Sequence, residues 1–148
     1  MIVGGILYEL RKATENDVQL LIKYKLSTIF QFAADISNNE EKEIKEYVND
    51  SVPKLLNEYK IIVVNGHDIG CFLVTDYEDG KLIDEIYLED EYRGKGIGTD
   101  LISNILNKHN VAYLWVYKQN KEAIKLYKKL GFKIELETDT RYFMKHEN

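Results

Sequence analysis

The chain has 148 residues, of which 45% are apolar, and its 20 basic and 25 acidic side chains give a formal net charge of −5. This length suits a single domain, expected over residues 1–148, and the apolar fraction excludes an intrinsically disordered chain. The acidic balance opposes a broad nucleic-acid interface, because such an interface needs a basic face.

The sequence carries no recognisable targeting signal. The opening segment, Met1 to Leu7, is short, lacks basic residues and runs into charge at Glu9, so we expect no signal peptide. No apolar run reaches the length that crosses a bilayer, and we expect no membrane partner. The single cysteine, Cys71, lies in an apolar run, which predicts an inert core thiol in a reducing compartment. We therefore expect a cytoplasmic protein.

The first third of the chain predicts one strand and two helices. Residues 8–13 are expected to form the strand, and Thr14 to cap the next helix with Asp17 three residues on, as in a capping box. Apolar residues at helical spacing follow. The second helix is expected to be capped by one of the asparagines at 38–39 and to end near Pro53, which lacks an N–H donor.

The rest of the chain predicts further strands and two more helices. The expected strands cover residues 60–64, 69–77, 81–88, 111–117, 133–138 and 141–145, and the expected helices cover 99–108 and 120–130. Asn65-Gly66 marks a hairpin turn, and Gly131 closes the last helix. The pattern predicts an α+β fold with a mixed, mostly antiparallel sheet of about six to seven strands flanked by about four helices.

A glycine-rich segment, Arg93-Gly94-Lys95-Gly96-Ile97-Gly98, lies between the expected strand 81–88 and the expected helix 99–108. Glycine tolerates positive φ and leaves backbone N–H groups accessible, and a helix start adds a favourable dipole. Such a segment therefore suits a phosphate group. From the glycines alone, a turn that binds no ligand is an equal alternative.

Two common nucleotide-binding loops do not fit this segment. A P-loop needs a lysine after its second glycine and then Ser or Thr, whereas Lys95 lies between the glycines. A dinucleotide fingerprint needs a third glycine where Thr99 stands, and an acidic residue about 20 positions on, where the chain has Tyr117, Lys118 and Gln119. Both kinds of site are excluded.

Two linked motifs resemble those of the GNAT superfamily of N-acetyltransferases. The family's acetyl-CoA loop has the form Gln/Arg-x-x-Gly-x-Gly/Ala, which Arg93, Gly96 and Gly98 match. The family's other cofactor segment is an Asn followed by a helix that bears a Tyr and ends in Gly-Phe. The matching residues here are Asn120, Ala123, Tyr127, Gly131 and Phe132. The order of the elements is similar to that of the family along the whole chain.

The resemblance implies a GNAT-like fold that transfers an acetyl group from acetyl-CoA to a primary amine by direct attack in a ternary complex. It also implies that strands 82–88 and 111–117 part to admit the pantetheine arm, with the Leu88 N–H facing the developing oxyanion. The cofactor-binding residues that it implies are Ile86, Tyr87, Leu88, Arg93, Gly94, Lys95, Gly96, Ile97, Gly98, Thr99, Asn120, Ala123 and Tyr127.

Two residues are expected to be catalytic, Tyr127 and Glu85. Tyr127 would protonate the departing thiolate, and its alternative role is that of an aromatic core residue. The amine must lose a proton, and Glu85 is placed ahead of Asp84 or a water as the base, with a surface salt bridge to a nearby lysine as the alternative for Glu85. Strand alternation places Ile83, Glu85 and Tyr87 on one face.

The motifs leave the acceptor and the partners open. Acidic residues near the cleft strand favour a small cationic amine; they are Asp84, Glu85, Glu89, Asp90 and Glu91. A peptide or protein amine is one alternative, and a non-catalytic acyl-CoA-binding or regulatory module is another. An acyl group longer than acetyl also stays open. No histidine or cysteine spacing suggests a metal site. Homodimers occur among similar proteins, but no patch in the sequence is diagnostic of one.

Overall fold

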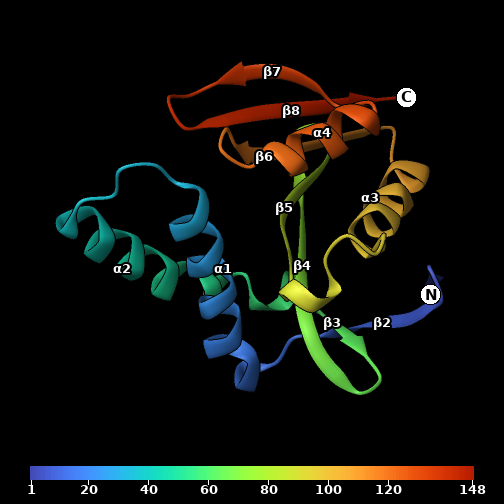
Figure 1. The fold of residues 1–148 in the computed structure, drawn as a ribbon, viewed down its shortest axis with the longest axis horizontal. Coiled ribbons are helices and arrows are strands. Elements are labelled where there is room, and N and C mark those ends of the chain that lie inside the picture. Colours follow the sequence, from blue (N-terminus) through green and yellow to red (C-terminus); the bar gives the residue numbers. More distant parts are fainter.

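The computed structural model describes residues 1–148 as one eight-stranded sheet with helices on both faces (Figure 1). The strands are β1 (Ile2–Val3), β2 (Ile6–Lys12), β3 (Tyr59–Val64), β4 (His67–Tyr77), β5 (Gly80–Leu88), β6 (Val111–Tyr117), β7 (Lys133–Glu137) and β8 (Arg141–Glu147). The helices are α1 (Val18–Phe32), α2 (Asn38–Lys54), α3 (Ile97–Lys108) and α4 (Lys121–Lys129). The order across the sheet is β1-β2-β3-β4-β5-β6-β8-β7. None of the helices combines the length and apolarity that crossing a bilayer requires.

Two separate cores hold the helices on opposite faces of the sheet. Buried residues of α1 and α2 pack on β3 and β4 around Tyr59, Ile61 and Leu73. Buried residues of α3 and α4 pack on the other face around Leu114 and Met144. Figure 1 accordingly shows α1 and α2 on one side of the sheet and α3 on the other. Anything that contacts α1 and α3 together must therefore pass through the sheet or around its edge.

The predicted α+β class and the four helices are confirmed, and most element boundaries agree to within two residues. The capping box of Thr14 and Asp17 is present, with the Thr14 N–H donating to the Asp17 carboxylate at 2.7 Å. The second helix is capped by Ser37 rather than by residues 38–39, since the Ser37 hydroxyl accepts from the Glu40 N–H. Pro53 is tolerated one residue before the end of α2.

The sheet has eight strands rather than about six or seven, because an N-terminal hairpin adds β1. Gly4 and Gly5 both take positive φ in the turn that joins β1 to β2. This turn lies against the glycine-rich segment: a Cβ at Gly96 would come within 3.0 Å of the Val3 side chain, and one at Gly4 within 3.3 Å of the Lys95 carbonyl oxygen. The N-terminal hairpin thus packs against the glycine-rich segment.

The central parallel pair, β5 and β6, is joined over only three residues of each strand. Lys81, Leu82 and Ile83 pair with Ala112, Tyr113 and Leu114, and no pairing continues beyond them. From there β5 stays paired with β4 as far as Leu88, and β6 stays paired with β8 as far as Tyr117. The two strands therefore part toward their C-terminal ends, which agrees with the gap that the family resemblance implies.

A β-bulge lies where the two strands part. Leu73 of β4 pairs with Glu85 while its neighbour Val74 pairs with Ile83, so Asp84 is the extra residue on β5. Ile83 packs in the α3/α4 core, as does Ile86. Glu85 instead contacts the α1/α2 core. The predicted alternation, with Ile83 on the face of Glu85, is therefore wrong, because the bulge reverses the facing of every later residue.

We predict that Gly70→Ala destabilises the fold, because a Cβ at Gly70 would lie 2.1 Å from the Tyr87 carbonyl oxygen. Backbone cannot move aside cheaply, so the free energy of unfolding should fall by about 1–3 kcal/mol in urea titrations. Gly98→Ala is the matched control, since its Cβ would meet no atom within 4 Å and alanine favours a helix by up to ~1 kcal/mol. Equal stability of the two variants would contradict the prediction.

Candidate active site

A cavity of about 820 Å³ lies at the gap between β5 and β6. Its lining comes from four places: α1, the end of β5, the segment from Arg93 into α3, and the start of α4. The α1 residues are Thr28, Gln31 and Phe32. Since α1 covers one face of the sheet and α3 and α4 cover the other, a cavity lined by all three passes through the gap. The cavity thus has walls from both faces of the sheet.

The structure brings most of the predicted cofactor-binding residues to this one cavity. Its lining includes Ile86, Tyr87, Leu88, Arg93, Gly94, Gly96, Ile97, Gly98, Thr99, Asn120, Ala123 and Tyr127. Two of the predicted site residues do not line it, Lys95 and Glu85. Lys95 is exposed on the loop without an ion pair, as expected for a solvated cation.

The loop before α3 presents unpaired backbone donors. The N–H groups of Gly94, Lys95 and Gly96 donate to no acceptor in the chain, and the first N–H groups of a helix, here from Ile97 on, have none within the helix. Gly94 and Gly96 hold positive φ of 72° and 92°. A Cβ at Gly94 would meet no atom within 4 Å. This arrangement of open donors at the start of a 12-residue helix suits a phosphate group.

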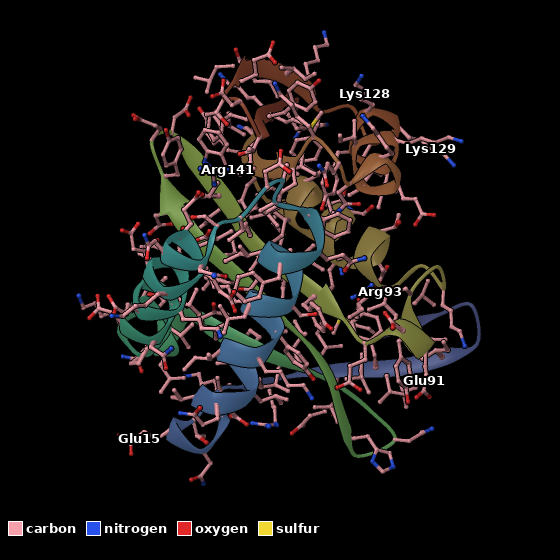
Figure 2. All side chains as sticks on the ribbon, turned by 60° about the vertical axis from the view of Figure 1, so that its left-hand side comes forward. Glu15, Glu91, Arg93, Lys128, Lys129 and Arg141 are labelled. Carbon is pink, nitrogen blue, oxygen red and sulfur yellow. The ribbon has the colours of Figure 1, made fainter.

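Arg93 fastens the loop to the end of β5. Its Nε donates to the Leu88 carbonyl oxygen at 2.7 Å, and its Nη1 pairs with Asp90 at 3.0 Å. The guanidinium carbon lies 5.1 Å from the centre of the Tyr87 ring, which stacks in turn on Tyr24 of α1. Figure 2 labels Arg93 beside the loop. Arg93 therefore positions the loop. To contact a phosphate as predicted, its guanidinium would have to bind the phosphate while it keeps the bonds to Leu88 and Asp90.

The backbone of Leu88 faces the gap. The Glu89 N–H donates to the Ile69 carbonyl oxygen at 2.8 Å, so that pair is hydrogen-bonded to β4. In an antiparallel ladder the next pair, here Gly70 with Leu88, points its N–H and C=O groups away from the partner strand. The bond from Arg93 to the Leu88 carbonyl oxygen agrees with this direction. The Leu88 N–H is thus a free donor at the cavity.

Tyr127 and Asn120 line the cavity from α4. The Asn120 side chain accepts from the Ala123 N–H at 3.2 Å and caps the helix. Tyr127 packs beside Phe132, and burial raises the pKa of its phenol to about 12. Its hydroxyl makes no hydrogen bond within the chain, although it is not sealed from the cavity. It is therefore a protonated donor without a partner.

Glu85 lies on the other face of β5, in a buried polar cluster. Its carboxylate accepts from the Tyr59 hydroxyl at 2.7 Å and the Cys71 thiol at 3.1 Å, and Lys25 of α1 stands 4.0 Å away. Burial raises the pKa of Glu85. These partners hold both carboxylate oxygens in the cluster rather than in the cavity. The pair with Lys25 differs from the surface salt bridge expected as the alternative, because the Glu85 side chain is buried.

The acidic residues expected to attract a cationic acceptor are mostly engaged. Glu89 accepts from the Tyr24 hydroxyl at 2.7 Å, and Asp90 pairs with Arg93. Glu85 is sequestered as described. Only Asp84 and Glu91 are exposed without an ion pair. The electrostatic reason for preferring a small cationic amine is therefore weak.

Sequence reasoning missed the contribution of α1 to the cavity. Thr28, Gln31 and Phe32 line it, yet no motif surrounds them. It also missed the stack of Tyr24 on Tyr87, whose ring centroids lie 4.4 Å apart. Both depend on how α1 lies across the sheet, which helical periodicity alone does not fix.

The chain is similar to known acetyltransferases. The family model described as an acetyltransferase (GNAT) domain matches residues 57–134. An uncharacterised N-acetyltransferase, MJ1207 of Methanocaldococcus jannaschii, is 36% identical over 81 residues, which are 47% of this chain and 36% of that protein. The chain thus matches well under half the length of that relative.

Two relatives have named acceptors. The peptidyl-lysine N-acetyltransferase YjaB of Salmonella typhimurium is 29% identical over 74% of this chain and 76% of its own. The spermidine N(1)-acetyltransferase of Escherichia coli is 37% identical over 40% of this chain and 36% of its own. Among solved structures, the PaiA N-acetyltransferase of Thermoplasma acidophilum in complex with coenzyme A has a TM-score of 0.75 at 24% identity and covers 97% of this chain and 100% of that one. This last likeness concerns the fold.

We predict that Glu85 makes the fold less stable as pH rises. A carboxyl whose pKa is raised by burial keeps a proton that the unfolded chain releases near pH ~4.3. The free energy of unfolding therefore falls through that window, by about 1.4 kcal/mol for each unit by which the folded pKa exceeds the unfolded one.

Urea titrations between pH 4 and 8 test this. Glu85→Gln should remove the fall in the free energy of unfolding. The difference in this free energy between wild type and variant should therefore grow with pH and then level off. Glu91→Gln, at an exposed site without an ion pair, is the control and should follow the wild type. Parallel curves for wild type and Glu85→Gln would contradict the prediction.

Proposed function

The chain belongs to the GNAT acetyltransferase family, and from this we propose that it transfers an acetyl group from acetyl-CoA to a primary amine, in a ternary complex by direct attack. The observation that carries the proposal is the cavity through the β5–β6 gap, which brings open loop donors, the free Leu88 N–H and the unpartnered Tyr127 hydroxyl together. A non-catalytic acyl-CoA-binding module would have no need for the last two groups.

The residues of the cavity fit acetyl-CoA. The N–H groups from Gly94 to Thr99 would hold its pyrophosphate at the start of α3. The edges of Ile86 and Leu88 would pair with its pantetheine arm as a neighbouring strand does. Asn120, already a helix cap, would offer its remaining donors to the same arm. Bound acetyl-CoA would supply the thioester carbonyl that the amine attacks.

Two groups of the chain would serve the chemical step. The Leu88 N–H would donate to the carbonyl oxygen as negative charge develops on it. Tyr127 would donate to the sulfur as the carbon–sulfur bond breaks. Because its pKa is about 12 and that of a thiol is ~8.5, complete proton transfer from the phenol alone would cost about 5 kcal/mol. The proton that the amine loses must therefore replace the one that Tyr127 gives.

The base that accepts the proton of the amine is proposed to be a group other than Glu85. Its carboxylate oxygens are occupied by Tyr59 and Cys71. Asp84, exposed on the bulge beside the gap, and water in the cavity are the groups that we propose for this role. A direct role of Glu85 would need the cluster to open.

The acceptor is proposed at the level of a primary amine, either a peptide lysine or a small cationic amine. The peptide lysine draws its support from a relative that aligns over 74% of the chain, and the small cationic amine from one that aligns over 40%. Release of free thiol from acetyl-CoA with a panel of both kinds of amine tests the proposed function. Tight CoA binding with no release for any amine would favour the binding module.

We predict that Tyr127→Phe lowers kcat by about 10²-fold or more, the size expected of a lost general acid. Binding of CoA, measured by calorimetry, should change less than about twofold, since the phenol acts on the sulfur only as it leaves. Tyr47→Phe, at a side chain that is 63% exposed on α2, is the control and should behave as wild type. Unchanged kcat in Tyr127→Phe would remove this residue from the acid role.

We predict that Gly96→Val weakens CoA binding by at least about tenfold. The substitution forces a β-branched residue into φ 92° and pushes it against Val3, and tenfold corresponds to about 1.4 kcal/mol. Gly66→Val carries the same strain, at φ 77° in the hairpin turn before β4, without touching the cavity. It should lose stability but bind CoA normally. Normal binding by folded Gly96→Val would contradict the loop assignment.

A further inference from the structure

Arg141, the first residue of β8, is a cation without a counterion. Arg11 pairs with Asp17 and Asp68, and Arg93 pairs with Asp90. The chain has no other arginine besides these three. The Arg141 guanidinium donates to no carboxylate, carbonyl or hydroxyl group in the structure, although its own backbone is bonded to Thr138. Its five donors are therefore open.

The guanidinium of Arg141 is held in place by an aromatic ring. Its central carbon lies 4.5 Å from the centre of the Trp115 ring, and the side chain is only partly exposed. Two lysines nearby also lie over rings: Lys118 over Tyr142 and Lys145 over Tyr113. Each of these lysines has a glutamate partner, at 2.6 Å and 3.4 Å respectively. A contact with an aromatic ring thus does not explain why Arg141 is the only one of these three cations without an acidic partner.

Arg141 does not itself line the cavity; it lies on β8, next to the part of β6 that borders the gap. It pairs in register with Tyr117, and Trp115 pairs with Phe143, in the part of β6 that has left β5. Trp115 and Phe143 pack with Tyr113 away from the α3/α4 core. The cofactor-binding loop and α4 lie on the α3/α4 face, so an amine must approach from the side of α1, where Figure 2 shows Arg141.

A guanidinium stacked on an indole is oriented for one kind of ligand. Stacking fixes the plane of the fork and leaves its edge free, and that edge matches the two oxygens of a carboxylate. The guanidinium is also weakly hydrated, so little is lost when water is displaced from it. A cationic acceptor such as a polyamine would instead be repelled here.

We propose that Arg141 and Trp115 form a carboxylate-binding subsite for the acceptor, so that the amine acetylated by this protein carries an acidic group close by. This inference rests on the proposed function and narrows its acceptor class. The carboxylate has two possible sources: an acidic residue beside a lysine in a peptide, or the α-carboxylate of a free amino acid. The chemistry at Arg141 is the same for both.

The position of the only tryptophan in the chain allows the subsite to be tested without turnover. In the presence of CoA, Trp115 fluorescence is titrated with two blocked peptides that differ only in Lys-Glu against Lys-Gln. We expect a saturable change with a Kd about tenfold lower for the Glu peptide, which corresponds to one charge-assisted pair. Arg141→Gln should abolish the difference. Lys129→Gln removes a charge from exposed α4, where Figure 2 labels it apart from Arg141, and should preserve the difference.

Equal Kd values within both pairs of compounds in the wild type, the two peptides and free lysine with lysine amide, would overturn the proposal, as would a difference that survives in Arg141→Gln. Free lysine and lysine amide, compared in the same titration, identify the source: discrimination between these two and not between the peptides assigns the subsite to an α-carboxylate and supports it equally.

Thiol release with the same four compounds separates this inference from the proposed function. If the compounds with lower Kd also have higher kcat/KM, and Arg141→Gln makes the kcat/KM values equal, both the transferase function and the subsite stand. If no compound releases thiol while the Glu peptide still binds through Arg141, the transferase function fails and the subsite stands. If thiol is released equally from all four compounds, the function stands and the carboxylate proposal is overturned.

Discussion

The parting of β5 from β6 after three paired residues is the constraint on which the rest of this structure depends. Each strand keeps its other neighbour, β4 or β8, so the gap opens without loosening the sheet. What it exposes is backbone that would have paired across it, including the N–H of Leu88, whereas the Leu88 carbonyl oxygen accepts from Arg93. A buried, unpaired backbone edge is costly unless a ligand or water satisfies it, so the gap must stay open to one or the other.

The bulge at Asp84 decides which side chains that gap receives. Without it, Glu85 would share the face of Ile83 and lie with the α3/α4 core. With it, the carboxylate turns into the cluster of Tyr59, Cys71 and Lys25, and Ile86 and Leu88 take the face of Ile83. The cavity therefore gains apolar walls and free backbone, and it lacks the Glu85 carboxylate that had been expected to act there as the base.

This division explains what could be predicted from the sequence and what could not. The loop from Arg93 to Gly98 and the helix that begins at Asn120 are local motifs, so their residues could be read in order and the structure brings most of them to one cavity. The facing of Glu85 depends on one inserted residue, which no periodicity reveals. The β1 hairpin rests on two positive-φ glycines beside Val3, and the role of α1 on its angle across the sheet. All three are tertiary outcomes.

The two sides of the site are consequently built from different materials. The side toward α3 consists largely of backbone donors at glycines, which tolerate few substitutions but require no particular side chains. The side toward α1 consists of side chains: Thr28, Gln31, Phe32 and Tyr87, with the proposed subsite of Trp115 and Arg141 outside this lining. Of these, Tyr87 also contacts Arg93, which fastens the loop, whereas the α1 side chains have no such link to it. For that reason the cofactor side can be inferred from a short motif, whereas the acceptor has to be inferred from which charges the fold leaves unpaired.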